Sequence, residues 1–110
     1  AYNGRCDVYT LQGEFDKAFA DCDKAIELKP KYAFAFINRG KVYDGKGDYE
    51  KAIADYTQAI ELNPRYANAY YYRGLTLAQK GDIDAAKADF EKVLELNPYD
   101  ARARKKLEDL

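Results

Sequence analysis

The chain has 110 residues, a length that suits one domain able to bury roughly two thirds of the surface of the unfolded chain. Its 18 basic and 19 acidic residues nearly cancel, so the net charge does not indicate a nucleic acid or an anionic membrane as partner. The chain contains no histidine, serine, tryptophan or methionine, which removes most side chains used as nucleophiles, proton shuttles or zinc ligands, so we do not expect an enzyme.

One stretch of sequence occurs three times at a constant spacing of 34 residues. The positions that mark this spacing are Pro30, Pro64 and Pro98; Gly13, Gly47 and Gly81; Ala18, Ala52 and Ala86; and Asp21, Asp55 and Asp89. A period of this length is typical of an all-α solenoid, in which each antiparallel helix pair needs its neighbours to cover its apolar face. We therefore predict a single domain, 1–110, with three repeats at about 1–32, 33–66 and 67–100 and a capping helix at about 101–110.

The first repeat starts part-way through a helix that we predict over residues 1–11. Aligning it with residues 35–45 leaves the first residues of the copy absent. Gly13 breaks this helix, and a second one runs from residue 14 to Leu28, where Lys29-Pro30 stops it because proline lacks the N–H that would continue the ladder. The partial copy and the missing initial methionine lead us to expect a piece of a longer protein.

The second and third repeats carry the same two helices in full. In the second, we predict a helix over residues 33–46 and a turn at Gly47-Asp48, with Asp48 as the N-cap of the next helix. Small residues on the inner stripes, such as Gly74 on the first helix and Ala86 on the second, let the two backbones approach closely, while aromatic side chains fill the layers above and below. Enlarging Gly74 should therefore be costly.

Residues 101–110 follow the last proline and form a predicted terminal helix. Four basic side chains keep most of it in water, namely Arg102, Arg104, Lys105 and Lys106. Leu107 and Leu110 remain to cover the third repeat, which is the arrangement of a solenoid cap.

These repeats resemble the tetratricopeptide repeat family over nearly the whole chain. The residues that carry the resemblance in the third copy are Tyr70, Gly74, Leu77, Gly81, Ala86, Phe90, Val93 and Pro98. The family's usual tryptophan is replaced by Tyr2, Phe36 and Tyr70, and its usual leucine before the glycine by arginine. The resemblance implies a right-handed superhelix whose first helices line a concave groove, and a function in binding peptides or assembling complexes.

Cys6 and Cys22 are the only cysteines, and they stand where the second repeat has Gly40 and Tyr56. A larger side chain on one helix thus faces a smaller one on the other. We expect two packed thiols, because nothing in the sequence resembles a secretion signal. A disulfide is the alternative, and it requires Cα atoms within ~7 Å. Two thiols without histidine argue against a metal site, and no cofactor is expected.

Arginine and aspartate recur in step in all three repeats. Folding each helix pair back on itself places Arg5, Arg39 and Arg73 near Asp21, Asp55 and Asp89, respectively. A feature present in every copy is better interpreted as a repeated interhelical ion pair than as a catalytic dyad. Where such a pair is partly buried, removing one partner should destabilise more than removing both.

Eight residues on the first helices of repeats 2 and 3 lie roughly opposite the packing stripe, at about 100° per residue. They are Phe34, Ile37, Asn38, Lys41, Asn68, Tyr71, Tyr72 and Leu75. We predict that they line the groove, with Asn3 and Asp7 added by the first repeat and Arg102, Lys105 and Lys106 by the last helix. Aromatic rings beside amides suit an extended peptide or a partner helix. The alternative is that these groups cover one another or a neighbouring repeat.

One type of ligand can be tested against the sequence. Family members that bind acidic chaperone C-termini hold the carboxylates with lysine, arginine and asparagine at fixed groove positions, and only Asn38 fits that pattern here. Asn3, Asp7, Asn68 and Tyr72 occupy the other positions. An aspartate in place of a donor would repel an acidic ligand, so a chaperone adaptor of that kind is disfavoured.

Three functions remain, in this order. The first is a protein-interaction module, a scaffold or adaptor that holds a protein or peptide partner in its groove. The second is a structural stacking unit of a larger protein, which forms homo-oligomers through its open ends. RNA binding comes last, because the groove lacks a continuous basic stripe, and we expect no nucleic acid or membrane partner.

The compartment is predicted from what the sequence lacks. No apolar run approaches the ~20 residues that span a bilayer, and the first residues do not resemble a signal peptide. We therefore expect a soluble, cytoplasmic protein.

Overall fold

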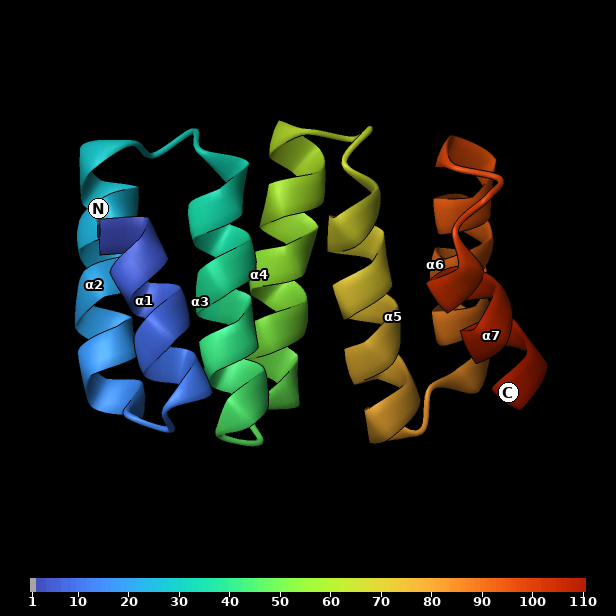
Figure 1. The fold of residues 1–110 in the computed structure, drawn as a ribbon, viewed down its shortest axis with the longest axis horizontal. Helices are drawn as coiled ribbons and strands as arrows, with labels where there is room; N and C mark the ends of the chain where they lie inside the picture. Colours follow the sequence, from blue (N-terminus) through green and yellow to red (C-terminus); the bar gives the residue numbers. More distant parts are fainter. Residues whose placement is uncertain (1) are drawn as a thin grey trace.

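The computed structural model describes the backbone of residues 2–110 and the side chains from Gly4 onward. Within this range the chain forms seven α-helices and no strand (Figure 1). The helices are α1 (Tyr2–Leu11), α2 (Phe15–Leu28), α3 (Ala33–Gly45), α4 (Tyr49–Leu62), α5 (Ala67–Lys80), α6 (Ile83–Leu96) and α7 (Ala101–Asp109). The predicted bounds agree to within two residues, and residue 1 of the first predicted helix lies outside the described residues.

The helices form a row of pairs. α1 packs on α2, α3 on α4 and α5 on α6; α2 then contacts α3, α4 contacts α5, and α7 packs on α6. Figure 1 shows this row along the long axis of a body of 36 × 25 × 21 Å, with the two ends of the chain at opposite ends. The all-α solenoid is confirmed. None of the helices in the described range has the length and apolar character needed to cross a bilayer.

Glycines and aspartates set the turns within the pairs. Gly47 and Gly81 have φ values of +82° and +97°, a region that side chains with a Cβ rarely adopt. Asp48 caps α4 as predicted, because its side chain accepts a hydrogen bond from the backbone N–H of Lys51. Asp100 does the same for α7 through the backbone N–H groups of Arg102 and Ala103. Each pair therefore turns at the equivalent glycine, whereas the side-chain cap of Asp48 is not repeated by Asp82 at the start of α6.

The two complete pairs are held by an aromatic ring resting on a glycine. A methyl group built on Gly40 would lie 2.6 Å from Cε1 of Tyr56, and one on Gly74 would lie 2.9 Å from Cε1 of Phe90. Both rings are almost fully buried. Only glycine lets the first helix approach the ring this closely, which is the small-and-large alternation that the sequence predicts.

The first pair is held differently, and here the expectation of two packed thiols is wrong. Cys6 and Cys22 form a disulfide, with their Cα atoms 5.4 Å apart and both side chains fully buried. The sequence argument gave weight to the absence of a secretion signal, whereas the geometry was decisive. Two positions that face each other across a close helix pair lie within the distance that a disulfide spans.

The predicted ion pairs are present in all three repeats. Each arginine donates two hydrogen bonds of 2.7 to 2.8 Å to its aspartate, as Arg73 does to Asp89. The aspartate carboxylates are almost completely buried. The hydrogen bonds from Arg5 hold the pKa of Asp21 below its ordinary value. These pairs join the two helices of each repeat and are structural.

Candidate functional site

The predicted groove residues lie on α3 and α5, the first helices of the two complete pairs. Most of them are half-buried, which leaves part of each side chain open to a ligand. Phe34 is the most exposed of the set, at 36%. Asn3, predicted to contribute from the first repeat, lies outside the residues whose side chains are described.

Ile37 departs from the prediction. Its side chain is only 3% exposed and belongs to a core cluster with Tyr56 of α4 and Ala69 of α5. The angular position on α3 was predicted relative to α4 alone, but in a solenoid α5 packs on α4 and also covers part of α3. Ile37 therefore supports the groove from beneath and offers no contact surface to a ligand.

Tyr71 and Tyr72 form the centre of the surface. Their ring centroids lie 5.8 Å apart in an edge-on arrangement. The ring of Tyr72 stacks on buried Tyr56 at 6.1 Å, and that of Tyr71 lies 5.9 Å from buried Phe90. Because the core holds both rings in place, they lose little conformational freedom when a partner packs on them.

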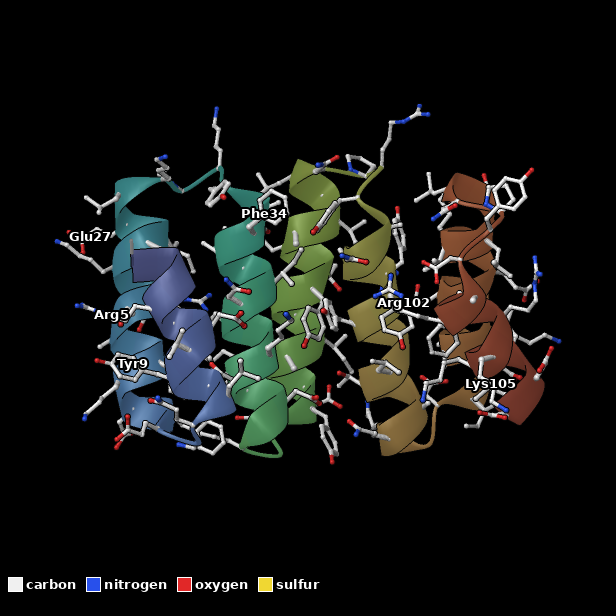
Figure 2. The ribbon with its side chains drawn as sticks, in the orientation of Figure 1. Arg5, Tyr9, Glu27, Phe34, Arg102 and Lys105 are labelled. Carbon is white, nitrogen blue, oxygen red and sulfur yellow. A yellow bond between two sulfur atoms is a disulfide. The ribbon has the colours of Figure 1, made fainter. Side chains whose placement is uncertain are left out.

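A cation from a neighbouring helix lies over each of these rings. Nζ of Lys41 is 4.4 Å from the ring centroid of Tyr72, and the guanidinium of Arg102 is 4.4 Å from that of Tyr71. Figure 2 shows Arg102 reaching from α7 toward α5. Lys41 also forms an ion pair with Asp7 of α1 at 3.9 Å. The predicted set thus joins α1, α3, α5 and α7 into one surface.

Asn68 is tied to two neighbours. Its amide oxygen accepts a hydrogen bond of 2.8 Å from Arg102, and its amide nitrogen donates one of 3.3 Å to the hydroxyl of Tyr66. Arg102 in turn bonds to the carboxylate of Asp100, whose pKa it holds below the ordinary value. The charge of Arg102 is therefore neutralised within the chain, and the Asn68 amide keeps one further N–H and one further acceptor position beyond these two hydrogen bonds.

The two lysines that were predicted at the same edge differ in their surroundings. Lys105 is largely exposed and pairs along α7 with Asp109 at 3.5 Å. Lys106 is half-buried and lines the hollow described below. Of the two, only Lys106 lines this hollow.

Two aromatic side chains that contact the predicted Phe34 were missed by sequence reasoning, namely Tyr32 and Tyr66. The ring of Phe34 lies between the other two: its centroid is 5.2 Å from that of Tyr32 and 4.6 Å from that of Tyr66. Tyr32 and Tyr66 occupy the same position of consecutive repeats, directly before a helix. That repetition is a signal that could have found them.

Sequence reasoning also missed a hollow of about 500 Å³ that is lined by residues of α3, α5, α6 and α7. Its lining includes Asp44, Leu75, Ala78, Lys106, Asp109 and Leu110. Asp44 follows Lys41 by three residues, so extending the predicted face by one helical turn would have included it. The carboxylate of Asp44 accepts a hydrogen bond of 3.2 Å from Thr76, and partial burial raises its pKa.

Comparisons with known proteins agree with this architecture. A sequence model described as Tetratricopeptide repeat matches residues 1–32 and 67–100, another of that description matches 22–54, and one described as TPR repeat matches 45–81. No curated protein sequence matches the chain.

Solved structures resemble the chain over almost its full length. The first TPR of Spaghetti (RPAP3), bound to the HSP90 peptide SRMEEVD, is 29% identical with a TM-score of 0.91, covering 98% of this chain and 86% of that one. The second TPR domain of human RPAP3, in complex with the HSP70 peptide SGPTIEEVD, is 30% identical with a TM-score of 0.89, covering 98% and 90%. The Sgt2 TPR domain from Aspergillus fumigatus, at 24% identity and a TM-score of 0.91 over 98% and 73%, supports the fold alone.

Proposed function

The chain belongs to the tetratricopeptide repeat family, and on this premise we propose that it is a protein-interaction module that holds an extended peptide or a partner helix in its groove. The contact residues that we assign are Phe34, Asn38, Lys41, Asn68, Tyr71, Tyr72 and Leu75, with Ile37 beneath them. Its activity is binding, as an adaptor or scaffold within one domain, 1–110, and involves no catalytic residue and no cofactor.

The observation that carries this proposal is the pair Tyr71 and Tyr72. Both rings are half-buried, fixed against core aromatics, and overlaid by cations from α3 and α7. Tyrosines held in one conformation supply apolar contact area at low entropic cost, and such residues are enriched where protein partners bind.

The neighbours from RPAP3 bind acidic chaperone peptides, but we do not assign that ligand here. The carboxylate of Asp7 pairs with Lys41, and that of Asp100 pairs with Arg102, so these groove cations are already neutralised by the chain itself. A ligand recognised through its carboxylates alone would have to displace both aspartates. A peptide that covers the tyrosines with apolar side chains needs no such exchange.

A displayed library of random peptides, panned on the protein, tests the proposal. We expect recovered peptides to bind the variant Tyr71→Ala/Tyr72→Ala at least ~10-fold more weakly, because the two rings form the centre of the contact. Tyr99→Ala is the matched control, since this ring is 91% exposed and lies outside the groove. Circular dichroism must show unchanged helix content, and equal binding by the double variant would refute the groove assignment.

Self-assembly is the second candidate, and the exposed apolar surface of α1 favours it. Leu11 is 82% exposed and Val8 is half exposed. If this surface joins copies of the chain, the mass measured by sedimentation will rise with concentration in the wild type. Leu11→Glu will then remain monomeric. A concentration-independent mass would exclude this candidate without affecting the groove.

The cytoplasmic location expected from the sequence stays a prediction, and the disulfide provides its test. The cytoplasm keeps most protein thiols reduced, whereas disulfides persist in oxidising compartments. If the protein works in the cytoplasm, alkylation of Cys6 and Cys22 in freshly lysed cells will label both thiols. Labelling of neither would favour an oxidising compartment.

A further inference from the structure

The hollow lined by α3, α5, α6 and α7 lies directly beside the proposed contact surface. Leu75 belongs to both, and the hydroxyl oxygen of Thr76 lies 3.2 Å from the backbone oxygen of Tyr72 and 3.2 Å from the carboxylate of Asp44, so its single proton is shared between the two acceptors. Its volume of about 500 Å³ is ample for one long amino-acid side chain. A segment that covers Tyr72 and Leu75 therefore brings its adjoining side chains to the mouth of the hollow.

The wall of the hollow combines apolar cover with a carboxylate. Leu75 and Ala78 on α5, Phe90 on α6 and Leu110 after α7 provide the apolar part. Asp44, from α3, provides the carboxylate, and within the described part of the chain no lysine or arginine lies within ion-pair distance of it. Its hydrogen bond comes from Thr76, a neutral donor. An aliphatic wall that ends in an unneutralised carboxylate matches a side chain with a methylene stem and a terminal cation.

The other charges at the hollow do not remove this preference. Asp109 already pairs with Lys105 on the surface of α7. Lys106 lines the same hollow and is a like charge to any incoming cation, but its side chain is long and can extend into solvent. The features of the hollow that a ligand can still match are therefore the carboxylate of Asp44, which has no ion-pair partner among the described residues, and the apolar wall.

We propose that this hollow is the pocket for a basic side chain, lysine or arginine, of the segment bound in the groove. Asp44 accepts hydrogen bonds from the ammonium or guanidinium, and Leu75, Ala78 and Leu110 cover the methylenes. This assignment rests on the proposed peptide-binding function and adds the charge that the ligand must carry.

The polar network behind Asp44 supports the assignment. Thr76 is fully buried and lies between Asp44 and the buried ring of Tyr56. Burial raises the pKa of Asp44, and burial together with the charge of Asp44 raises the pKa of Tyr56. Burial therefore disfavours the charged form of Asp44, with the hydrogen bond from Thr76 opposing that effect. A cation delivered by the ligand would favour the charged form.

The test begins with peptides recovered from the displayed random library. We expect them to share a lysine or arginine at one aligned position. Replacing that residue with norleucine, which keeps the stem and removes the charge, should weaken binding to the wild type about 10-fold. The same replacement should change binding to Asp44→Asn less than about 2-fold, because the variant has already lost the attraction. The amide introduced by Asp44→Asn keeps an oxygen acceptor for Thr76, which protects the fold.

Two further variants complete the test. Lys106→Met should strengthen binding of the basic peptide a few-fold, because it removes a like charge from the hollow. Asp84→Asn, on an exposed part of α6, is the charge-matched control and should behave as the wild type. Recovered peptides without a shared basic residue, or an equal norleucine effect in wild type and Asp44→Asn, would overturn the pocket while leaving the groove intact. Failure to recover any peptide would overturn both.

Discussion

The second and third helix pairs place a ring on a glycine, whereas the first pair places a disulfide at the same position. Gly40 with Tyr56 and Gly74 with Phe90 are contacts that depend on shape. Cys6 and Cys22 reach the same closeness through a covalent bond. The repeat therefore requires close approach of its two helices at this position, and it accepts more than one chemical means of holding them.

The ring-on-glycine contact and the disulfide respond to different perturbations. A buried ring contributes through the apolar area it removes from water and through the cavity that its loss would leave. A disulfide acts mainly by restricting the unfolded chain, although the balance of entropy and enthalpy depends on the treatment. The first pair should thus depend on redox conditions, and the other two should not.

The largest expected effect comes from reduction of the disulfide. The bond closes a sequence separation of 16 residues, for which loop entropy gives about 3 kcal/mol of stabilisation. Adding a dithiol reductant should therefore accelerate hydrogen exchange in α1 and α2. Exchange in α5 and α6 should change little, because solenoid repeats couple mainly to their neighbours.

The control for this experiment is Cys6→Ala/Cys22→Ala, whose exchange should already be fast in α1 and α2 and should not respond to the reductant. Equal acceleration in all seven helices would contradict the comparison, since it would mean that the first pair and the others unfold as one unit.

The next effect, of opposite sign in the two regions, comes from adding a methyl group to a glycine. Gly74→Ala places a Cβ 2.9 Å from the ring of Phe90, and the overpacking should cost about 1 to 3 kcal/mol. Gly4→Ala in α1 meets no atom within 4 Å and should stabilise the helix by about 0.5 to 1 kcal/mol. Urea unfolding of both variants measures the difference. Stabilisation by both substitutions would show that helix propensity outweighs packing at Gly74.

The difference between the first helix pair and the other two also explains how far the sequence could predict the structure. Every feature that occurs in all three copies was predictable: the helix bounds, the glycine turns and the ion pairs typified by Arg73 with Asp89. Repetition gives three independent observations of each. The disulfide occurs once, so Cys6 and Cys22 had no second copy for comparison, and an argument about the compartment gave the wrong answer.

The exposed face of α3 and α5 was predictable in outline and not in depth. The spacing on α3 and α5 identified the exposed face, including Tyr71 and Tyr72, because a helix repeats its surface regularly. It could not reveal that Ile37 is covered, since that depends on how α5 packs on the preceding pair. The hollow at Asp44 is lined by four helices, from two repeats and the cap, and no spacing along a single helix contains that information.

The smallest effect distinguishes the ion pairs of the first and third repeats. The side chain of Arg5 is 55% exposed and that of Arg73 is 23% exposed. Solvent screens the exposed pair more strongly, so Arg5→Met should cost less than Arg73→Met, and both variants leave a buried carboxylate without its arginine. Arg73 also donates a hydrogen bond to Thr57 of the preceding repeat, at 3.2 Å, which adds to its loss.

The pKa of Asp21 determines how the effect of Arg5→Met on stability changes with pH. The pKa of Asp21 is lowered in the folded protein, chiefly by hydrogen bonds from Arg5, so the folded state favours the charged carboxylate. The resulting stabilisation is fully present above the pKa of an unfolded aspartate, about 3.9, and is lost as the pH falls through the lower folded value. The difference in unfolding free energy between wild type and Arg5→Met should therefore be constant near neutral pH and shrink below about pH 4. A difference that grows on acidification would mean that Arg5 does not stabilise the carboxylate of Asp21. The first and third helix pairs would then differ in their ion pairs as well as in the disulfide that only the first pair has.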